Sequence, residues 1–278
     1  LSSFAVHYTG PGSRHGQTLY LHTSPEFAMK RLLAAGSGCI YQIARVFRDG
    51  EAGRRHNPEF TLLEWYRVGF DHHRLMDETA ALVAELLAGR LSLQKPERLS
   101  YQEIFQRRLG LDPHRATVAE LAAGAAAQNV PIPSGMPLND PDPWLDLLLT
   151  HRIEPELGQG RLTFGYDYPV SQAALARLRP GDPPVGERFE LYLNGVELAN
   201  GFHELGDAIE QRRRFVAENA VRRAAGLPEM PVDEALLAAL AAGLPKCAGV
   251  ALGFDRLVML AAGKASIQPT MAFAIDRA

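Results

Sequence analysis

The sequence has few cysteines, no long apolar run and no excess of basic residues. Its two cysteines, Cys39 and Cys247, are far apart and form no metal-ligand motif, so we expect reduced thiols packed in the interior. No apolar run reaches the roughly 18 residues of a membrane helix, and no secretory signal is present. The formal net charge of −3 argues against a general nucleic-acid binder. These absences together favour a soluble cytoplasmic protein.

Residue patterns predict an α+β fold with an antiparallel sheet flanked by helices. Ser24-Pro25-Glu26 offers a capping hydroxyl, a proline for the first helical position and an acid near the positive helix end. Hairpin-type connections, including a turn at Asn194-Gly195, favour antiparallel pairing over the strand–helix alternation of a parallel sheet. We therefore expect a single domain over residues 1–278.

The predicted elements follow from periodicity and from boundary residues. Strands are predicted over residues 40–47, 60–68, 161–168, 188–193, 196–199 and 249–253. Helices are predicted over residues 25–35, most of 71–130, 144–152, 207–226 and from 255 onward. A charged loop over residues 48–57 joins the first two strands into a long hairpin, and the prolines within residues 129–143 indicate another loop. His72-His73 is expected on the surface, at a helix start.

The long hairpin carries arginines and an aromatic residue. Arg48 enters its loop, His56 lies near the end of the loop, and Phe60 begins the returning strand. A guanidinium is a planar, permanently charged fork that suits phosphate or carboxylate, and Phe60 offers a stacking face to a base. A hairpin holds such groups rigidly, as stabilisation of a transition state requires. A charged turn exposed to solvent is the alternative interpretation.

The returning strand places an acid among apolar residues. Side chains alternate along a strand, so Phe60, Leu62, Glu64 and Tyr66 share one face. A carboxylate among apolar neighbours is costly unless it meets a cation. This face therefore predicts a site for a positively charged group, unless the face is simply exposed to water.

Two further segments carry polar residues suited to a nucleotide. Glu190 and Glu197 flank the Asn194-Gly195 turn and could meet across it, where paired carboxylates invite Mg²⁺ beside phosphates. Surface acids on a strand are the alternative. Near the end of the chain, Gly253 permits close approach of a ligand, and Arg256 lies at a helix start, where phosphate is favoured. This segment is not a P-loop, because no Gly-Lys-Ser/Thr follows.

The order of these residues resembles the catalytic domain of class II lysyl-tRNA synthetases. The resemblance covers nearly the whole chain and rests on residues 23–26, 47–48, 55–61, 64–66, 190, 197, 200–202, 204 and 253–256. Segments 29–36, 53–56, 195–205 and 275–278 are similar to truncated paralogues that modify elongation factor P and lack an anticodon-binding domain. The resemblance implies a single catalytic domain that adenylates (R)-β-lysine and transfers it to a lysine of elongation factor P.

The resemblance also implies a role for each candidate residue, with ATP and Mg²⁺ as cofactors. Arg48 would hold the α-phosphate and the substrate carboxylate, and Arg256 would hold the γ-phosphate, which makes both catalytic. The other ATP-binding residues would be Asp49, Gly50, His56, Asn57, Phe60, Glu190, Leu191 and Gly253. Glu190 and Glu197 would bind the metal. The pocket for lysine or β-lysine would comprise Ser24, Pro25, Glu26, Glu64, Tyr66, Glu197, Asn200, Glu204 and Ala251.

Three features differ from the pattern of lysyl-tRNA synthetases. Ala251 stands where they have glycine, and its methyl group is expected to disfavour α-lysine by roughly 1–3 kcal/mol. Gly50 stands where the family has a glutamate, with Glu51 beside it. The dimer-forming first motif is expected before Leu1, so a homodimer is implied by the resemblance alone.

Other functions are compatible with parts of this pattern. A truncated lysyl-tRNA synthetase would prefer α-lysine, but the chain carries no anticodon-binding segment, which makes tRNA an unlikely partner. A related asparagine synthetase would not need two acids for a diamino substrate. A catalytically silent binding subunit would have lost its arginines or metal acids, yet Arg48, Arg256, Glu190 and Glu197 are all present.

Overall fold

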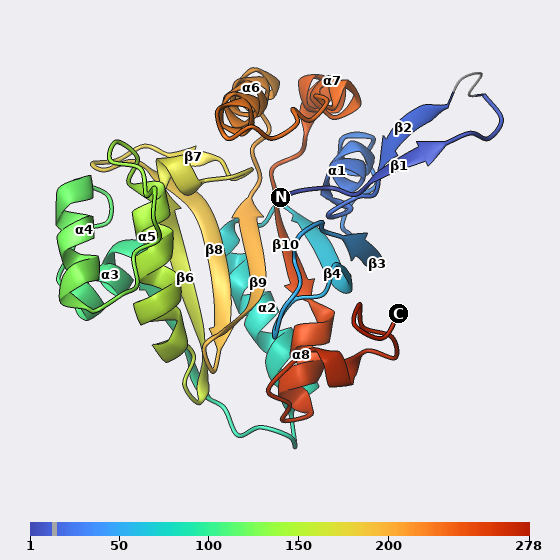
Figure 1. Ribbon diagram of the computed structural model, residues 1–278. Helices are drawn as coiled ribbons and strands as arrows, with labels where there is room; N and C mark the ends of the chain where they lie inside the picture. Colours follow the sequence, from blue (N-terminus) through green and yellow to red (C-terminus); the bar gives the residue numbers. More distant parts are fainter. Residues whose placement is uncertain (13–15) are drawn as a thin grey trace. The chain divides into compact units, whose positions relative to one another are not determined.

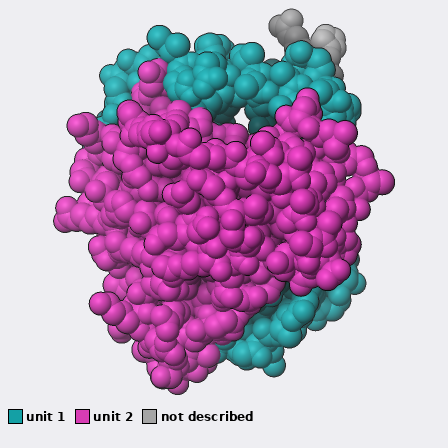
Figure 2. Space-filling model, turned by 90° about the vertical axis from the view of Figure 1, so that its left-hand side faces the viewer, with its two compact units in different colours: residues 1–67, 208–245, 251–278 teal, residues 68–207, 246–250 magenta. Residues whose placement is uncertain are grey.

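The computed structural model describes residues 1–12 and 16–278. Within them the chain forms two compact units, which Figure 2 colours separately. Unit 1 comprises Leu1–Arg67, Ala208–Pro245 and Ala251–Ala278, and unit 2 comprises Val68–Asp207 and Lys246–Val250. Each unit therefore combines segments that are far apart in the sequence.

Unit 1 contains two antiparallel hairpins separated by a helix (Figure 1). These elements are β1 (Ala5–Tyr8), β2 (Gln17–Tyr20), α1 (Glu26–Ala34), β3 (Ile40–Phe47) and β4 (Glu59–Val68). β1 pairs with β2, and β3 pairs with β4. The register of the second hairpin runs without a bulge from Ile40 opposite Tyr66 to Phe47 opposite Glu59. This regular pairing determines where the loop over residues 48–58 begins and ends.

Helices complete unit 1. They are α6 (Ala208–Ala224), α7 (Glu234–Gly243), α8 (Phe254–Ala261) and the short 3-10 helix η4 (Gln268–Thr270). α7 packs against α1 and α6, and Figure 1 shows α6 and α7 side by side. Met29 and Leu33 of α1 and Leu236 and Leu240 of α7 are buried, as helices that pack together require.

Unit 2 is built on a mixed sheet that is mainly antiparallel. Its strands are β5 (Gln94–Ser100), β6 (Arg161–Pro169), β7 (Leu178–Arg179), β8 (Val185–Leu193), β9 (Val196–His203) and the first part of β10 (Cys247–Gly253). The strand order is β10-β9-β8-β6-β5, with β7 also paired to β8. β8 is antiparallel to β6 and β9, whereas β5 is parallel to β6. The central strand β8 is buried on both faces.

Helices and helical turns cover this sheet. They are α2 (His72–Leu87), α3 (Tyr101–Leu109), α4 (Val118–Ala127), α5 (Asp142–Leu148), the π-helical turn η1 (Leu149–Ile153) and the 3-10 turns η2 (Glu154–Glu156) and η3 (Val170–Gln172). α2 packs against β8 and β9, and α3 packs against β5 and β6. Tyr101, Phe105, Trp144, Leu148 and Tyr168 belong to one buried apolar cluster. α2 therefore lies against β8 and β9, and the apolar cluster lies against β6.

The α+β prediction is confirmed, and β3 has its predicted bounds. Three expectations were wrong. Residues 94–100 form the strand β5 inside a region predicted to be helical. Cys247 is buried, but Cys39 is exposed rather than packed in the interior. His72 does start a helix, yet only 1% of its surface is exposed, because α2 turns this residue toward the sheet.

Candidate active site

Arg48 lies where β3 enters the hairpin loop, and it is held from several sides. Its backbone N–H donates to Pro58 O at 2.8 Å, which closes the base of the loop. Its Nε donates to Thr23 O at 3.3 Å, and its guanidinium lies 4.9 Å from the centroid of the Phe60 ring. An ion pair of 3.7 Å joins it to Glu51. The guanidinium is therefore oriented in advance, while 23% of the side chain is still exposed to an incoming anion.

Phe60 and Ala251 lie at the edge of a small apolar cluster. Ala44, Val46 and Leu62 form the buried part of this cluster, and the two edge residues are only partly buried against it. Packing against the cluster holds the Phe60 ring in place while leaving part of it accessible. The ring can therefore serve as a stacking surface beside Arg48, as the sequence predicts. The Ala251 methyl belongs to the same apolar surface.

His56 and Arg256 form a second cationic group on unit 1. Arg256 lies in the first turn of α8, which begins directly after Gly253. Its Nε donates to Arg55 O at 3.3 Å, and its Nη2 lies 2.7 Å from His56 Nε2. A guanidinium can only donate, so His56 Nε2 must accept. Burial, followed by the charge of Arg256, lowers the pKa of His56, and the imidazole is therefore neutral near pH 7.

Further hydrogen bonds fix the end of the hairpin loop. Asn57 is 5% exposed, and its amide Nδ2 donates to Glu59 O at 2.6 Å while its Oδ1 accepts from Ile275 N at 2.9 Å. The buried carboxylate of Asp255 accepts from Thr61 N at 2.6 Å. The structure thus gives Asn57 a role in holding the loop, beside the ATP contact that the family resemblance implies.

The loop differs from the family pattern at Gly50, and its backbone explains how the difference is accommodated. Gly50 has a φ of +81°, in the left-handed region that favours glycine. Before it, Asp49 N donates to Ser2 O at 2.9 Å. After it, Glu51 lies 3.7 Å from Arg48. The turn at Gly50 therefore places Glu51, rather than residue 50, beside Arg48.

Replacing Gly50 by alanine is expected to lower the free energy of unfolding by about 1 kcal/mol, because an L residue is strained at this φ. No heavy atom lies within 4 Å of the added Cβ, so backbone strain is the only local cost. Gly53→Ala is the matched control in the same loop, since Gly53 also has open space around its Cβ and no positive φ. Urea denaturation of both variants measures the difference. Equal stabilities would contradict the strain at Gly50.

Glu64 is a buried residue of β4 and accepts two hydroxyl hydrogen bonds. Ser24 Oγ donates to its Oε2 at 2.7 Å, and Tyr66 OH donates to its Oε1 at 2.6 Å. Only 2% of Glu64 is exposed. Burial, and then the nearby charge of Glu26, raise the pKa of Glu64 to about 7 despite these donors. The nearby Lys30 ammonium pairs with Glu26, so the surroundings of Glu64 do not by themselves favour its ionised form.

Glu26, in the first turn of α1 after Pro25, already has a cationic partner. Lys30 Nζ lies 2.6 Å from Glu26 Oε1, and Lys30 itself is 1% exposed. This internal ammonium was not predicted, although the spacing of four residues is the usual signal for such a pair on a helix. Glu26 also donates its backbone N–H to Ser24 Oγ at 3.0 Å, which orients the hydroxyl toward Glu64.

In unit 2, Glu190 accepts hydrogen bonds from three side chains. Tyr168 OH donates to its Oε2 at 2.6 Å, Tyr192 OH donates to the same oxygen, and Arg188 donates to Oε1. Burial and the charge of Glu190 raise the pKa values of both phenols well above their usual range, so both remain donors. Arg188 Nε also donates to Asn200 Oδ1 at 3.1 Å. These three partners were not predicted, although Arg188 and Tyr192 stand two residues from Glu190 on the same strand.

A β-bulge brings Glu197 to the face of the sheet that carries Glu190. Across the β8–β9 pair, Glu190 is opposite Asn200 and Glu197 is opposite Tyr192, with the register shifting at the extra residue Leu198. Glu190 and Glu197 are therefore diagonal neighbours on one face, rather than direct partners across the turn. Diagonal positions lie about 7–8 Å apart, within reach of one shared cation.

The structure brings Glu190, Glu197 and Asn200 together and separates Leu191 from them. Leu191 is fully buried on the opposite face of β8, so only its backbone could contact a nucleotide. Glu204 follows β9, is 5% exposed, and donates its backbone N–H to Cys247 O at 3.0 Å. Its carboxylate is thus a buried acid at the end of the strand.

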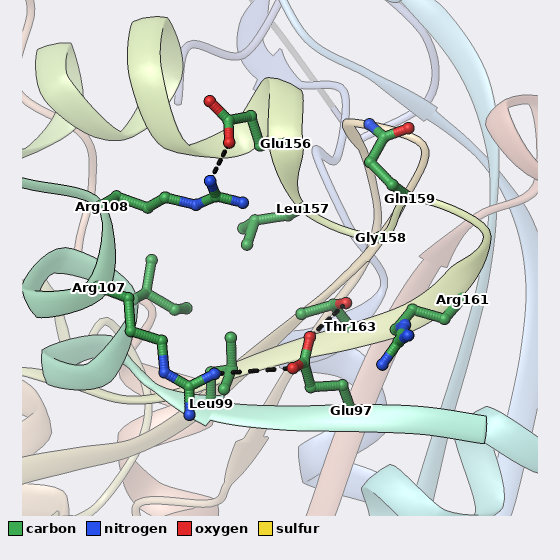
Figure 3. Close-up of a pocket in the computed structure, with 11 residues that line it drawn as sticks. Glu97, Leu99, Arg107, Arg108, Glu156, Leu157, Gly158, Gln159, Arg161 and Thr163 are labelled. Atoms are coloured by element: carbon green, nitrogen blue, oxygen red, sulfur yellow. Dashed lines mark hydrogen bonds and ion pairs between the residues drawn. The ribbon is translucent and has the colours of Figure 1, made fainter. Parts of the chain in front are cut away.

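A pocket of about 280 Å³ elsewhere in unit 2 is lined by none of the predicted site residues (Figure 3). Arg108 forms an ion pair with Glu156, and Arg107 lies 3.7 Å from Glu97. The figure shows these pairs at two sides of the opening. Each of these two arginines faces a carboxylate, whereas Arg161, which also lines the pocket, donates to the neutral Gln94.

Comparison with known proteins identifies the family of the chain. The family model described as "tRNA synthetases class II (D, K and N)" matches residues 3–277. The chain belongs to this class II synthetase family. Three curated relatives named "Elongation factor P--(R)-beta-lysine ligase", each covered over 84% of its length by the whole of this chain, are similar to it. They come from Vibrio cholerae (53% identical), Klebsiella pneumoniae (52%) and Salmonella paratyphi B (51%).

Membership of the class II synthetase family, together with relatives that are named as ligases, establishes the chain as an ATP-dependent ligase. No helix in the described part of the chain combines the length and apolar character needed to cross a membrane.

Proposed function

We propose that this chain activates (R)-β-lysine with ATP and transfers it to a lysine side chain of elongation factor P. The observation that carries the proposal is an identity of 51–53% over all 278 residues to relatives with that name. In the first step a carboxylate oxygen of β-lysine attacks the α-phosphorus of ATP, and pyrophosphate leaves. In the second step the acceptor amine attacks the acyl carbon, loses a proton, and AMP leaves.

The arginines of unit 1 provide the electrostatics for the first step. Arg48 binds the α-phosphate and the substrate carboxylate, and its hydrogen bond to Thr23 and its contact with Phe60 fix its direction. Arg256 binds the γ-phosphate, oriented by Arg55 O and neutral His56. Donors that are positioned before charge develops stabilise the transition state without reorganisation. Phe60 stacks on adenine, and Gly253 allows the nucleotide to approach the backbone.

Glu190 and Glu197 suit Mg²⁺ by their oxygen donors and their shared face. The ion, when bound, neutralises phosphate charge. Tyr168, Tyr192 and Arg188 hold the Glu190 carboxylate in a single orientation, and Arg188 would compete with the ion for Oε1.

The amino groups of the substrate are bound by acids. Glu26 takes the amine nearer the carboxylate, in competition with Lys30. The distal ammonium is recognised by Glu64, Tyr66 and Glu204. Asn200, held by Arg188, orients the substrate carboxylate. The raised pKa of Glu64 supports this assignment. A substrate ammonium would provide the positive charge that stabilises the buried carboxylate in its ionised form. The proposal includes a cytoplasmic homodimer as the working form, with no role for tRNA.

The test is amino-acid-dependent ATP–pyrophosphate exchange with (R)-β-lysine and α-lysine in parallel. We expect faster exchange with β-lysine, followed by transfer of the labelled acyl group to purified elongation factor P. The Ala251→Gly variant is expected to improve α-lysine exchange by about tenfold or more, because it removes a methyl group from a close-fitting surface. A preference for α-lysine in the unmodified chain would favour a truncated lysyl-tRNA synthetase instead. Absence of exchange with both would favour a silent paralogue.

A further inference from the structure

The face of β8 and β9 that turns away from Glu190 carries a second polar cluster. Glu187 is three residues from Glu190, and His203 is three residues from Asn200, so alternation along the two strands places them on the opposite face. His203 Nδ1 lies 2.9 Å from Glu187 Oε2. This cluster is therefore separate from the metal-binding acids proposed for ATP.

α2 adds a third ligand-type side chain to this face. Its first residue, His72, follows the N-cap Asp71 and points toward the sheet. One ligand atom each from His72, Glu187 and His203 can be chosen so that all three lie within 4.8 Å of one another. All three residues are buried, with exposures of 1%, 5% and 8%. Two imidazoles and a carboxylate that converge in the interior form a donor set used for zinc.

The ring of His72 gives independent evidence that the cluster is prepared for a ligand. Among the described residues, neither His72 nitrogen has a hydrogen-bond partner, and the nearest carboxylate oxygen, Asp167 Oδ1, is 3.8 Å from Nε2. Asp167 Oδ1 is likewise buried without a hydrogen bond. Buried polar atoms are rarely left in this state. A cation between these groups would satisfy both.

The backbone around Asp167 is irregular in a way that directs its side chain. Asp167 has a φ of +61°, which is uncommon for a residue other than glycine. The β6–β8 register shifts there, since Tyr166 is opposite Phe189 but Tyr168 is opposite Gly186. Such irregularities often re-aim a side chain at a functional site. Asp167 is thus available as a fourth ligand or as an outer partner of His72.

We propose that His72, Glu187 and His203 bind a divalent transition-metal ion of the zinc class, with Asp167 completing the site. Zinc–nitrogen bonds of about 2.05 Å in a tetrahedron separate ligand atoms by roughly 3.3 Å. The measured contact of 2.9 Å and the outer limit of 4.8 Å bracket this value, so side-chain shifts of about 1 Å suffice. The ion would join α2 to β8 and β9 and stiffen the strands that carry Glu190 and Asn200.

Two arginines compete with the ion for the carboxylates. Arg177 donates to Glu187 Oε2, and Arg179 donates to Asp167 Oδ2. These side chains are 43% and 39% exposed, so they can turn toward water when an ion enters. Imidazole ligands select zinc over Mg²⁺, which prefers oxygen ligands and keeps its waters. The site is therefore distinguishable from the Mg²⁺ site by metal preference.

The test is a competition titration of Zn²⁺ on the metal-free full chain, in excess Mg²⁺, using a chromophoric chelator. We expect one tight site, a rise in Tm of roughly 5 °C at a hundredfold excess over Kd, and binding of Co²⁺ that shifts proton resonances of two histidines. His203→Gln is expected to weaken Zn²⁺ binding by at least about tenfold. Arg177→Gln is expected to strengthen it, because it frees Glu187 Oε2.

His73→Gln is the matched control for the titration. His73 is adjacent to His72, with ring centroids 4.1 Å apart, but it is not part of the cluster. It should bind Zn²⁺ as tightly as the unmodified chain. Equal losses in both histidine variants, or unchanged affinity in Arg177→Gln, would overturn the assignment. If His203→Gln does not fold, the unmodified chain decides: no Tm rise with Zn²⁺, or no shifted histidine resonances with Co²⁺, would also overturn it.

Discussion

Arg48→Ala is expected to lower the kcat of β-lysine-dependent ATP–pyrophosphate exchange by about 10²–10³-fold. This is the usual effect of removing one positioned donor from a site where negative charge develops. The loss should be in kcat more than in the KM for ATP, because the guanidinium contributes most when the α-phosphorus is attacked. Arg48→Lys should recover little of it, since an ammonium cannot bind phosphate and carboxylate together as a planar fork does.

Arg45→Ala is the matched control for this experiment. Arg45 lies on β3, three residues before Arg48, its side chain is 60% exposed, and it makes a 3.7 Å ion pair with Glu59. Its removal should leave exchange unchanged. Arg48→Ala should also remain folded, because the hydrogen bond to Thr23 and the cation–π interaction with Phe60 together stabilise the fold by only about 1–2 kcal/mol. If the kcat of Arg48→Ala stays within tenfold of that of the unmodified chain, Arg48 does not have the proposed role.

Local patterns in the sequence were sufficient to predict the elements that hold these arginines. The alternation over residues 40–47 predicted β3 with its observed bounds, because one face of that strand packs against the apolar cluster and the other is exposed. β5 was missed because Gln94, Lys95 and Glu97 give it no apolar alternation. It is a strand because its backbone pairs with β6, and no local pattern reveals a partner about 65 residues away.

The candidate site was predictable in composition but not in its detailed arrangement. Motif residues identified Glu190, Glu197 and Asn200, but the bulge at Leu198 that puts Glu197 on their face has no recognisable residue signature. The burial of His72 was also unpredictable, because a histidine at a helix start is usually solvated and only the packing of α2 on β8 and β9 turns it inward. Side-chain chemistry is read from sequence, whereas register and packing decide which groups meet.

Glu64→Gln is expected to raise the KM for β-lysine by about 10²–10³-fold. The side chain is buried, and loss of one member of a buried charged pair costs roughly 2–5 kcal/mol. Glutamine has nearly the same shape and can still bond Ser24 and Tyr66, so the protein should fold. Glu59→Gln is the control on the same strand, since the Glu59 side chain is 53% exposed. Equal KM values for the two variants would exclude Glu64 as the ammonium site.

The pH dependence of Glu64 provides a second test. Its pKa is about 7 in the folded chain against an ordinary 4.5, so the carboxyl is largely protonated at pH 6. A substrate ammonium needs the ionised form, and binding at pH 6 must first remove this proton, at about 1.4 kcal/mol per pH unit below the pKa. The KM for β-lysine should therefore be about tenfold higher at pH 6 than at pH 8, and Glu64→Gln should abolish that difference.

The same pKa shift predicts that the free energy of unfolding falls as the pH rises, whereas substrate binding improves. A raised pKa means that the folded chain favours protonated Glu64, so this contribution is complete below about pH 4.5 and is lost as the pH rises through about 7. Without substrate, Glu64→Gln should gain stability relative to the unmodified chain between pH 5 and 8, by up to about 3 kcal/mol. Saturating β-lysine should cancel the gain, because the bound ammonium stabilises the ionised carboxylate. Urea denaturation at pH 5 and 8, with and without β-lysine, measures both effects, and a pH-independent difference would contradict the assignment.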